Sequence, residues 1–234
     1  MLPVAILAGG LATRLHPLSQ RVPKALLPIV GRPFIFHQLD LLQSQGIEQV
    51  VICIGHLGEQ IEAAVGDGSA FGLQVRYSSD GAQLLGTGGA LRQALPLLGD
   101  RFFVLYGDSY VRCSLAEVQS AFGRLGRPAL MTVLRNDDRW ARSNVLLRDG
   151  EIIAYDKAAP RSGMVHVDFG VAVLSSRLLQ RYPRPRFDLG ELYAELSARR
   201  ELAAFEVGER FYEIGSPQGL ADTEAFLSRG PHRA

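Results

Sequence analysis

The beginning of the chain places the tightest constraint on the fold. An apolar segment, Val4–Ala8, runs directly into the pair Gly9-Gly10. The segment is too short to cross a membrane and has no basic region before it, so we predict a buried first strand and a cytoplasmic protein. In open α/β sheets, ligands bind beyond the carboxyl ends of the strands. The glycine pair therefore marks a candidate binding loop.

Strand and helix patterns alternate after this loop. The apolar periodicity predicts, in order, a helix over 33–45, a strand over 49–54, a helix over 58–65, a strand over 73–77, a helix over 88–95, a strand over 102–106, a helix over 115–125 and a strand over 129–134. This order predicts an α/β, Rossmann-like fold with a mixed, mostly parallel central sheet and helices on both faces.

The pattern changes after Leu134. The dipeptide Asp149-Gly150 separates two strand-like segments and predicts a hairpin. Later segments predict a strand over 165–174, a helix over 189–199, strands over 203–206 and 211–214, and a helix over 218–228. We therefore expect antiparallel strands added to a parallel core, in one domain over 1–234 with lobes at 1–134 and 135–234.

Composition excludes several classes of protein. Lys and Arg total 25 and Asp and Glu total 24, so the chain offers no evenly basic surface for nucleic acid. The two cysteines, Cys53 and Cys113, show no metal-type spacing and are expected to be reduced and inert. The 25 glycines follow no collagen period, so a collagen-like protein is excluded. Such a high glycine count in a folded domain points to positions where backbone must turn or approach another group closely.

The densest motif is LAGGLATRLHPLS over 7–19, followed by VPKALLPIVGRP over 22–33. It is neither a Walker loop nor the dinucleotide pattern G-x-G-x-x-G. It resembles the opening motif of the sugar-1-phosphate nucleotidyltransferases, with Ala12 and Ala25 where the family usually has Gly and Pro. The resemblance continues in order through GTGGAL, YGD, YDK, VDFGV and EIGSP.

This resemblance implies a GT-A-like form of the Rossmann-like fold and a Mg²⁺-dependent reaction. A nucleotidyl group would pass from a nucleoside triphosphate, held by the first lobe, to a sugar 1-phosphate, held by the second. The products would be an NDP-sugar and pyrophosphate. Every participant is an anion, so the reaction needs charge neutralisation and alignment more than a protein nucleophile.

The resemblance assigns catalytic roles to Arg14, Lys24 and Asp108. Arg14 would bind the triphosphate and the leaving pyrophosphate, Lys24 would lie beside the α-phosphate, and Asp108 would hold Mg²⁺. We expect Thr87 to cap the helix that follows it and Gly88 to leave room for the base. The predicted nucleotide contacts are Leu7, Ala8, Gly9, Gly10, Thr13, Arg14, Gln83, Thr87, Gly88 and Gly107.

The remaining assignments concern the metal and the sugar. Glu213 stands where the family has its second metal-binding Asp; it would either coordinate Mg²⁺ or only hydrogen-bond a neighbour. The predicted sugar-phosphate contacts are Asn144, Lys157, Asp168 and Gly170. Trp140, the single tryptophan, lies in a polar loop and would serve either as a lid or in packing.

Several substrates and functions remain open. The GTGGA stretch favours GTP with D-glycero-D-manno-heptose 1-phosphate or mannose 1-phosphate. Uridylyl or thymidylyl transfer to N-acetylmuramate 1-phosphate or glucose 1-phosphate is an alternative. Ala12 and Glu213 would suit a non-catalytic nucleotide-sugar-binding homologue. A GT-A-like glycosyltransferase would use a D-x-D motif, which Asp108-Ser109-Tyr110 lacks. We expect no nucleic-acid or membrane partner, and a monomer or homodimer.

Overall fold

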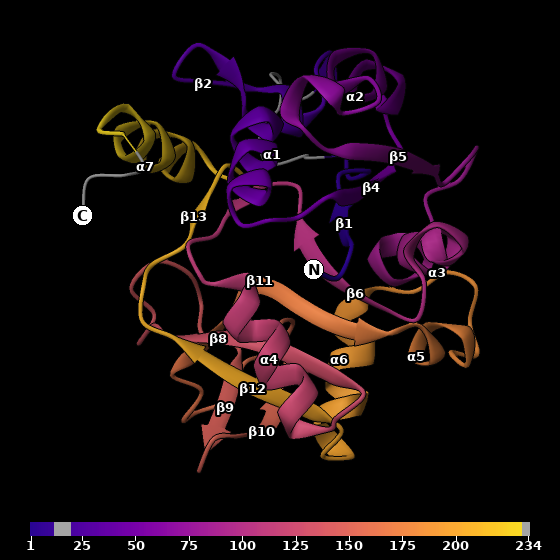
Figure 1. Ribbon diagram of the computed structural model, residues 1–234. Coiled ribbons are helices and arrows are strands. Elements are labelled where there is room, and N and C mark those ends of the chain that lie inside the picture. Colours follow the sequence, from indigo (N-terminus) through magenta and orange to yellow (C-terminus); the bar gives the residue numbers. More distant parts are fainter. Residues whose placement is uncertain (12–19, 231–234) are drawn as a thin grey trace.

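The computed structural model describes residues 1–11 and 20–230, and its core is one sheet (Figure 1). Within these residues the sheet has nine strands in the order β5-β4-β1-β6-β11-β8-β12-β10-β9. The strands are β1 (Val4–Leu7), β4 (Gln49–Ile54), β5 (Gln74–Ser79), β6 (Arg101–Tyr106), β8 (Ala129–Arg135), β9 (Val145–Arg148), β10 (Glu151–Tyr155), β11 (His166–Ser175) and β12 (Leu202–Val207).

Most neighbouring strands in the first part of the sheet are parallel. β1 lies between β4 and β6 and is parallel to both, with Val4 opposite Val50 on one side and Phe103 on the other. β11 is antiparallel to β6 and β8, and β12 is parallel to β8. The predicted mixed sheet is therefore confirmed. Its parallel part is β5-β4-β1-β6 with the pair β8–β12, while β11 and β10 pair antiparallel with their neighbours, so the sheet as a whole is not mostly parallel. Because β11 lies between β6 and β8, the two predicted lobes share one sheet. The assignment of the nucleotide to the first lobe and of the sugar to the second stays a prediction.

Helices cover both faces of the sheet, as predicted (Figure 1). α1 (Phe34–Ser44), α2 (Gly58–Val65) and α4 (Leu115–Leu125) bury their apolar side chains in one core. α3 (Gly86–Leu98), α5 (Ser176–Gln180) and α6 (Leu189–Ala198) do so in a second core on the other face. The sheet is thus shielded on both sides, which suits the continuous apolar runs of β1, β4 and β6.

The last part of the chain returns to the first lobe. β13 (Tyr212–Glu213) pairs with β7 (Ser109–Tyr110), and α7 (Pro217–Ser228) packs near the hairpin of β2 (Pro28–Ile29) and β3 (Arg32–Pro33). Ile214 and Leu227 join Ile29, Phe34 and Tyr110 in a third, smaller core. Residue 213 is thereby brought beside residue 109 although about a hundred positions separate them in the sequence.

Some local expectations are wrong. α3 begins at Gly86 with Leu85 as its N-cap, so Thr87 lies inside the first turn and does not cap this helix. The β2–β3 hairpin and two short helices, the 3-10 turns Lys24–Leu26 and Ser69–Phe71, were not predicted. In the described part of the chain, no helix is long and apolar enough to cross a membrane. Cys53 and Cys113 are both free.

Candidate active site

A cavity of about 270 Å³ opens at the carboxyl ends of β1 and β6. Eight of the residues predicted for catalysis or nucleotide binding line it: Leu7, Ala8, Gly9, Gly10, Lys24, Thr87, Gly107 and Asp108. The structure therefore brings most of the predicted nucleotide set together in one place. Thr13 and Arg14 lie outside the described residues.

The glycines of this cavity serve two different purposes. A Cβ on Gly107 would lie 2.7 Å from the Leu7 carbonyl oxygen, and one on Gly9 would lie 3.0 Å from the Gly55 nitrogen. These two glycines permit close approach of neighbouring backbones. A Cβ on Gly10 would meet no atom of residues 1–11 or 20–230 within 4 Å. Packing against the described residues therefore does not require glycine at position 10, and Gly10 lines the cavity, where a ligand could approach its backbone.

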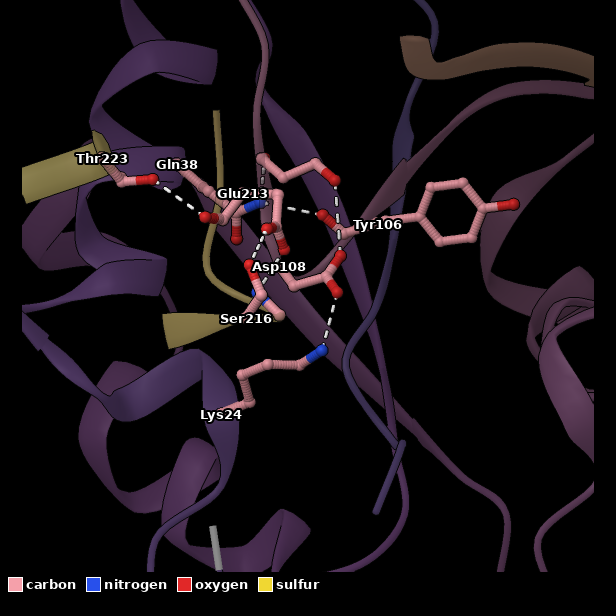
Figure 2. Close-up of polar contacts among 9 residues, drawn as sticks. Lys24, Gln38, Tyr106, Asp108, Glu213, Ser216 and Thr223 are labelled. Atoms are coloured by element: carbon pink, nitrogen blue, oxygen red, sulfur yellow. Dashed lines mark hydrogen bonds and ion pairs between the residues drawn. The ribbon is translucent and has the colours of Figure 1, made fainter. Parts of the chain in front are cut away.

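Lys24 and Asp108 form an ion pair at the edge of the cavity. Lys24 Nζ lies 2.6 Å from Asp108 Oδ2 (Figure 2). Lys24 comes from the 3-10 turn before β2, and Asp108 follows β6 in the turn that leads into β7. The two side chains are 22% and 30% exposed, so both reach the solvent-filled space and are available to an anionic ligand or a cation.

Glu213 lies near this ion pair, on the other side of Gly215, and we call this part of the cavity edge the Gly215 corner. Its Oε1 accepts a hydrogen bond from Ser216 Oγ at 2.5 Å, and its Oε2 accepts one from the Gly215 amide. A Cβ placed on Gly215 would lie 2.7 Å from Glu213 Oε2, 3.3 Å from Asp108 Oδ2 and 3.5 Å from Lys24 Nζ. Gly215 is thus the point at which both carboxylates and the ammonium group converge.

These residues fit a divalent cation such as Mg²⁺. Each carboxylate oxygen has two lone pairs, so the hydrogen bonds to Glu213 leave acceptor capacity on both of its oxygens. Within residues 1–11 and 20–230, no cluster of three or more His, Cys, Asp or Glu side chains is arranged to hold a metal. An ion bound here would therefore take further oxygen ligands from phosphates and water, as Mg²⁺ commonly does.

A second cavity of about 550 Å³ adjoins the first. The two share Thr87, Tyr106 and Asp188 as lining residues. Lys157 lines the second cavity, with its Nζ 5.5 Å from the centroid of the Tyr106 ring. A ligand phosphate at the boundary would thus have Lys24 on one side and Lys157 on the other.

Asp168 is a partly buried carboxyl group close to Lys157. Burial raises the pKa of Asp168, while the Gly170 amide, which donates to Oδ1 at 3.0 Å, and Lys157 act in the opposite direction. Gly170 has a φ of +98° where the pairing of β11 with β8 is interrupted. Asn144 Oδ1 accepts from the Asp168 amide at 3.0 Å. The predicted sugar-binding residues Asn144, Lys157, Asp168 and Gly170 are therefore assembled in one region.

The surroundings of Gly88, in the first turn of α3, differ from those expected for a base-binding loop. A Cβ on Gly88 would meet carbons of the Phe187 ring from 2.1 Å, so its missing side chain makes room for Phe187 and not for a base. Thr87 Oγ1 accepts from the Leu189 amide at 2.7 Å and thus helps to start α6. Gln83 is exposed and does not line the first cavity. The roles of Gln83 and Gly88 in nucleotide binding stay predictions.

Several lining residues were missed from the sequence: Asp80, Leu84, Tyr106 and Asp188. Asp188 forms a capping box with Glu191, and this D-x-x-E spacing could have been read as a helix start at 188. Cys53 also lines the cavity, and burial raises the pKa of its thiol to about 12. The thiol is therefore neutral at physiological pH and unsuited to nucleophilic attack.

The loop that carries Trp140 stays outside both cavities. The indole is 40% exposed, and the Arg210 guanidinium carbon lies 5.5 Å from its ring centroid. The same guanidinium lies 4.7 Å from the ring of Tyr212, the residue before Glu213. Trp140 thus has a packing role in this structure, in line with one of the two interpretations left open.

The fold thus places two adjoining cavities at the carboxyl edge of an α/β sheet. Comparison with known proteins gives the family: the nucleotidyl transferase model matches residues 4–143. The chain belongs to the nucleotidyl transferase family.

Named relatives act on different bases and sugars. The chain is 46% identical over 104 residues to an N-acetylmuramate alpha-1-phosphate uridylyltransferase of Neisseria meningitidis, covering 44% of this chain and 45% of that one. It is 27% identical over 217 residues to a D-glycero-alpha-D-manno-heptose 1-phosphate guanylyltransferase of Campylobacter jejuni, covering 91% and 94%. The chain spans only 45% and 54% of the Neisseria protein and of a Synechocystis UTP–glucose-1-phosphate uridylyltransferase.

Solved structures share the whole fold. HddC from Yersinia pseudotuberculosis complexed with GMP-PN is 25% identical with a TM-score of 0.78, covering 96% of this chain and 99% of that one. A UDP-glucose pyrophosphorylase from Acinetobacter baumanii is 19% identical with a TM-score of 0.79, covering 99% and 95%. The second likeness concerns the fold alone.

Proposed function

We propose that this chain joins a nucleoside triphosphate to a sugar 1-phosphate, releasing pyrophosphate and forming an NDP-sugar. The observation that carries the proposal is the convergence of Lys24, Asp108 and Glu213 around Gly215, at the edge of a glycine-lined cavity. The adjoining cavity that contains Lys157 supplies a second cation at the boundary. A reaction between two phosphorylated ligands needs both to be held side by side, with positive charge such as that of Lys24 and Lys157 to offset their mutual repulsion.

The reaction can be written with the chain's own residues. An oxygen of the sugar phosphate attacks the α-phosphorus, a new P–O bond forms, and the bond between the α-phosphorus and its bridging oxygen to the β-phosphate breaks. Lys24 stabilises negative charge on the α-phosphate, and Lys157 holds the attacking phosphate in line. Gly10 offers backbone without a side chain to the departing phosphates. Asp168 accepts hydrogen bonds from sugar hydroxyls.

Asp108 and Glu213 would hold Mg²⁺, as the fit of their carboxylates indicates. When bound, the ion supplies further neutralisation of the phosphate oxygens. Asp108 is oriented beforehand by Lys24, and Glu213 is oriented by the start of α7 through Gly215 and Ser216. Both carboxylates are therefore held in place by the protein's own contacts.

For the base, we propose guanine. The heptose 1-phosphate guanylyltransferase aligns over most of both chains, and the HddC structure contains GMP-PN. Asp80 supports this choice because it lines the first cavity and, among the residues that the structure describes, accepts a hydrogen bond only through Oδ2, from the Leu85 amide at 3.0 Å. Guanine presents N1–H and an amino group to such an acceptor. Uracil and thymine present carbonyl oxygens on either side of N3–H, which a carboxylate repels.

For the sugar, we propose a neutral aldose 1-phosphate, such as D-glycero-D-manno-heptose 1-phosphate or mannose 1-phosphate. The second cavity is lined by Asp156, Asp188 and Glu191 against Lys157. N-acetylmuramate carries an additional carboxylate, which these acidic groups disfavour. The 46% identity with the uridylyltransferase segment makes UTP with N-acetylmuramate 1-phosphate the second candidate.

A pyrophosphate-release assay with purified protein tests these proposals. The four nucleoside triphosphates and dTTP are each combined with heptose, mannose, glucose and N-acetylmuramate 1-phosphates in Mg²⁺ buffer. Turnover confined to GTP with a neutral sugar is the expected result. Preference for UTP with N-acetylmuramate 1-phosphate would reverse the choice of substrates, and no pyrophosphate from any pair would refute the enzyme proposal. Asp80→Asn should narrow the preference for GTP over UTP, because the amide presents a donor as well as an acceptor.

A further inference from the structure

Gln38 is a polar residue on the apolar side of α1. It lies among Phe34, Ile35, Leu39 and Leu42, all buried, and is itself 1% exposed. A buried amide is costly unless its polar atoms find partners, and an apolar side chain would suit this face of the helix better. The presence of Gln38 in the core therefore calls for a specific partner.

That partner is the turn that carries Asp108. Gln38 Nε2 donates to the Tyr106 carbonyl at 3.0 Å and to the Ser109 carbonyl at 2.7 Å. These two carbonyls bracket Gly107 and Asp108, so one amide group spans the whole turn (Figure 2). Both neighbours are acceptors, which fixes the orientation of the amide with its NH₂ toward the turn.

Only the donating end of Gln38 is used. Its Oε1 is buried and accepts no hydrogen bond from any residue that the structure describes. If the amide served general stability, both of its ends would be expected to find partners. The use of the NH₂ group alone indicates that Gln38 serves the Asp108 turn through its two N–H donors.

Two further supports of this turn come from the backbone. The Gly107 amide donates to the Leu7 carbonyl at 2.9 Å, and the Ile214 amide donates to the Asp108 carbonyl at 2.9 Å. These bonds attach the turn to β1 and to the segment after β13. Gln38 adds an attachment from α1, which binds the carbonyl groups on either side of the Gly107-Asp108 pair.

We infer that Gln38 is a positioning residue for the reaction. It acts through the backbone of the turn to direct the Asp108 carboxylate toward Lys24 and the corner at Gly215. The expected effect on kinetics rests on the proposed function, in which Asp108 holds the cation. Outer-shell partners of metal-binding groups commonly change metal affinity or activity by about 10–100-fold when removed.

Gln38→Met tests the inference, because methionine keeps the length of the side chain and removes the donors. The matched control is Gln45→Met, which removes a hydrogen bond between the same helix and the Leu115 amide, away from the turn. Three quantities are measured for both variants: kcat, the Mg²⁺ concentration at half-saturation, and KM for the sugar phosphate. Backbone hydrogen exchange of peptides covering 104–111 and 211–216 is followed without metal or substrates.

For Gln38→Met we expect kcat to fall about tenfold and the half-saturating Mg²⁺ concentration to rise about tenfold. KM for the sugar phosphate should stay unchanged, and exchange should accelerate in both peptides. Gln45→Met should match the wild type in all four. If Gln38→Met fails to fold, Gln38→Asn, which keeps the amide one methylene shorter, takes its place with the same expectations.

Wild-type kinetics with unchanged exchange would overturn the inference. Equal losses in both methionine variants would also overturn it, because they would show a general effect of α1. If the wild-type protein released no pyrophosphate with any substrate pair, the proposed function would fail. The exchange measurement would then still decide whether Gln38 holds the turn.

Discussion

Replacing Gly215 with alanine adds one methyl group at the point where the site converges. The φ of Gly215 lies outside the left-handed region, so alanine can adopt the backbone without strain. The new Cβ would, however, lie 2.7 Å from Glu213 Oε2 and 3.3 Å from Asp108 Oδ2. The first distance is too short for a real contact, so the Glu213 carboxylate must shift and weaken its bonds to the start of α7.

The cost can be worked out from these contacts. Overpacking by one methyl group typically costs about 1–3 kcal/mol of unfolding free energy. Each kcal/mol lowers Tm by about 2–4 °C in a chain of this size. Misplacing a catalytic group by about 1 Å can reduce turnover about 100-fold. We therefore expect Gly215→Ala to remain folded with a modestly lower Tm and to lose most of its kcat.

The assay is pyrophosphate release at saturating substrates over a range of Mg²⁺ concentrations, with Tm measured by differential scanning calorimetry. Gly123→Ala is the matched control, because Gly123 lies in α4 and a Cβ there meets no atom within 4 Å. This variant should keep full activity and be equally or slightly more stable. If Gly215→Ala kept the wild-type kcat and Mg²⁺ dependence, the convergence of Lys24, Asp108 and Glu213 at Gly215 would have no role in the reaction, and the proposal would be refuted.

Three further predictions concern single residues of the site. Gly10→Ala should fold normally, since its Cβ meets no atom of the described residues, yet raise KM for the nucleotide by blocking phosphate approach; an unchanged KM would remove Gly10 from the binding loop. Asp108→Asn should abolish measurable turnover while circular dichroism and Tm show an intact fold, and retained activity would refute its role in holding the cation. Asp168→Asn should raise Tm at neutral pH, because burial raises the pKa of Asp168 above its ordinary value of 3.8 and makes the ionised form costly. As the pH falls from that raised pKa toward 3.8, the unfolded-state value, the cost of ionising Asp168 is lost and the difference in Tm between the two proteins should shrink and disappear; a difference independent of pH would contradict this reasoning.

The order of strands and helices could be predicted because it depends on local periodicity. Lys24 and Asp108 could be predicted as a pair only through the family motifs, since nothing local to either residue indicates the 2.6 Å contact between them. The packing of Gly88 against Phe187 could not be predicted, because about a hundred positions separate the two residues in the sequence. Long-range packing of this kind leaves no periodic signal near the residue concerned.

Gln38 illustrates the same limit from another side. In the sequence it interrupts the apolar face of a helix and resembles a tolerated polar substitution. Its hydrogen bonds to Tyr106 and Ser109 depend on how α1 crosses the end of β6, which only the three-dimensional arrangement shows. The β2–β3 hairpin was missed because its turn uses Val30 at a φ of +50°, a conformation that valine rarely adopts.

The return of the chain to the first lobe has a consequence for its synthesis. Translation delivers Lys24 and Asp108 early, but Glu213 and the turn of α7 that holds it are made about a hundred residues later. A nascent chain can therefore fold most of its sheet and still lack half of the carboxylate pair. If Glu213 is required as proposed, the first turnover must wait until α7 has left the ribosome and docked against the β2–β3 hairpin.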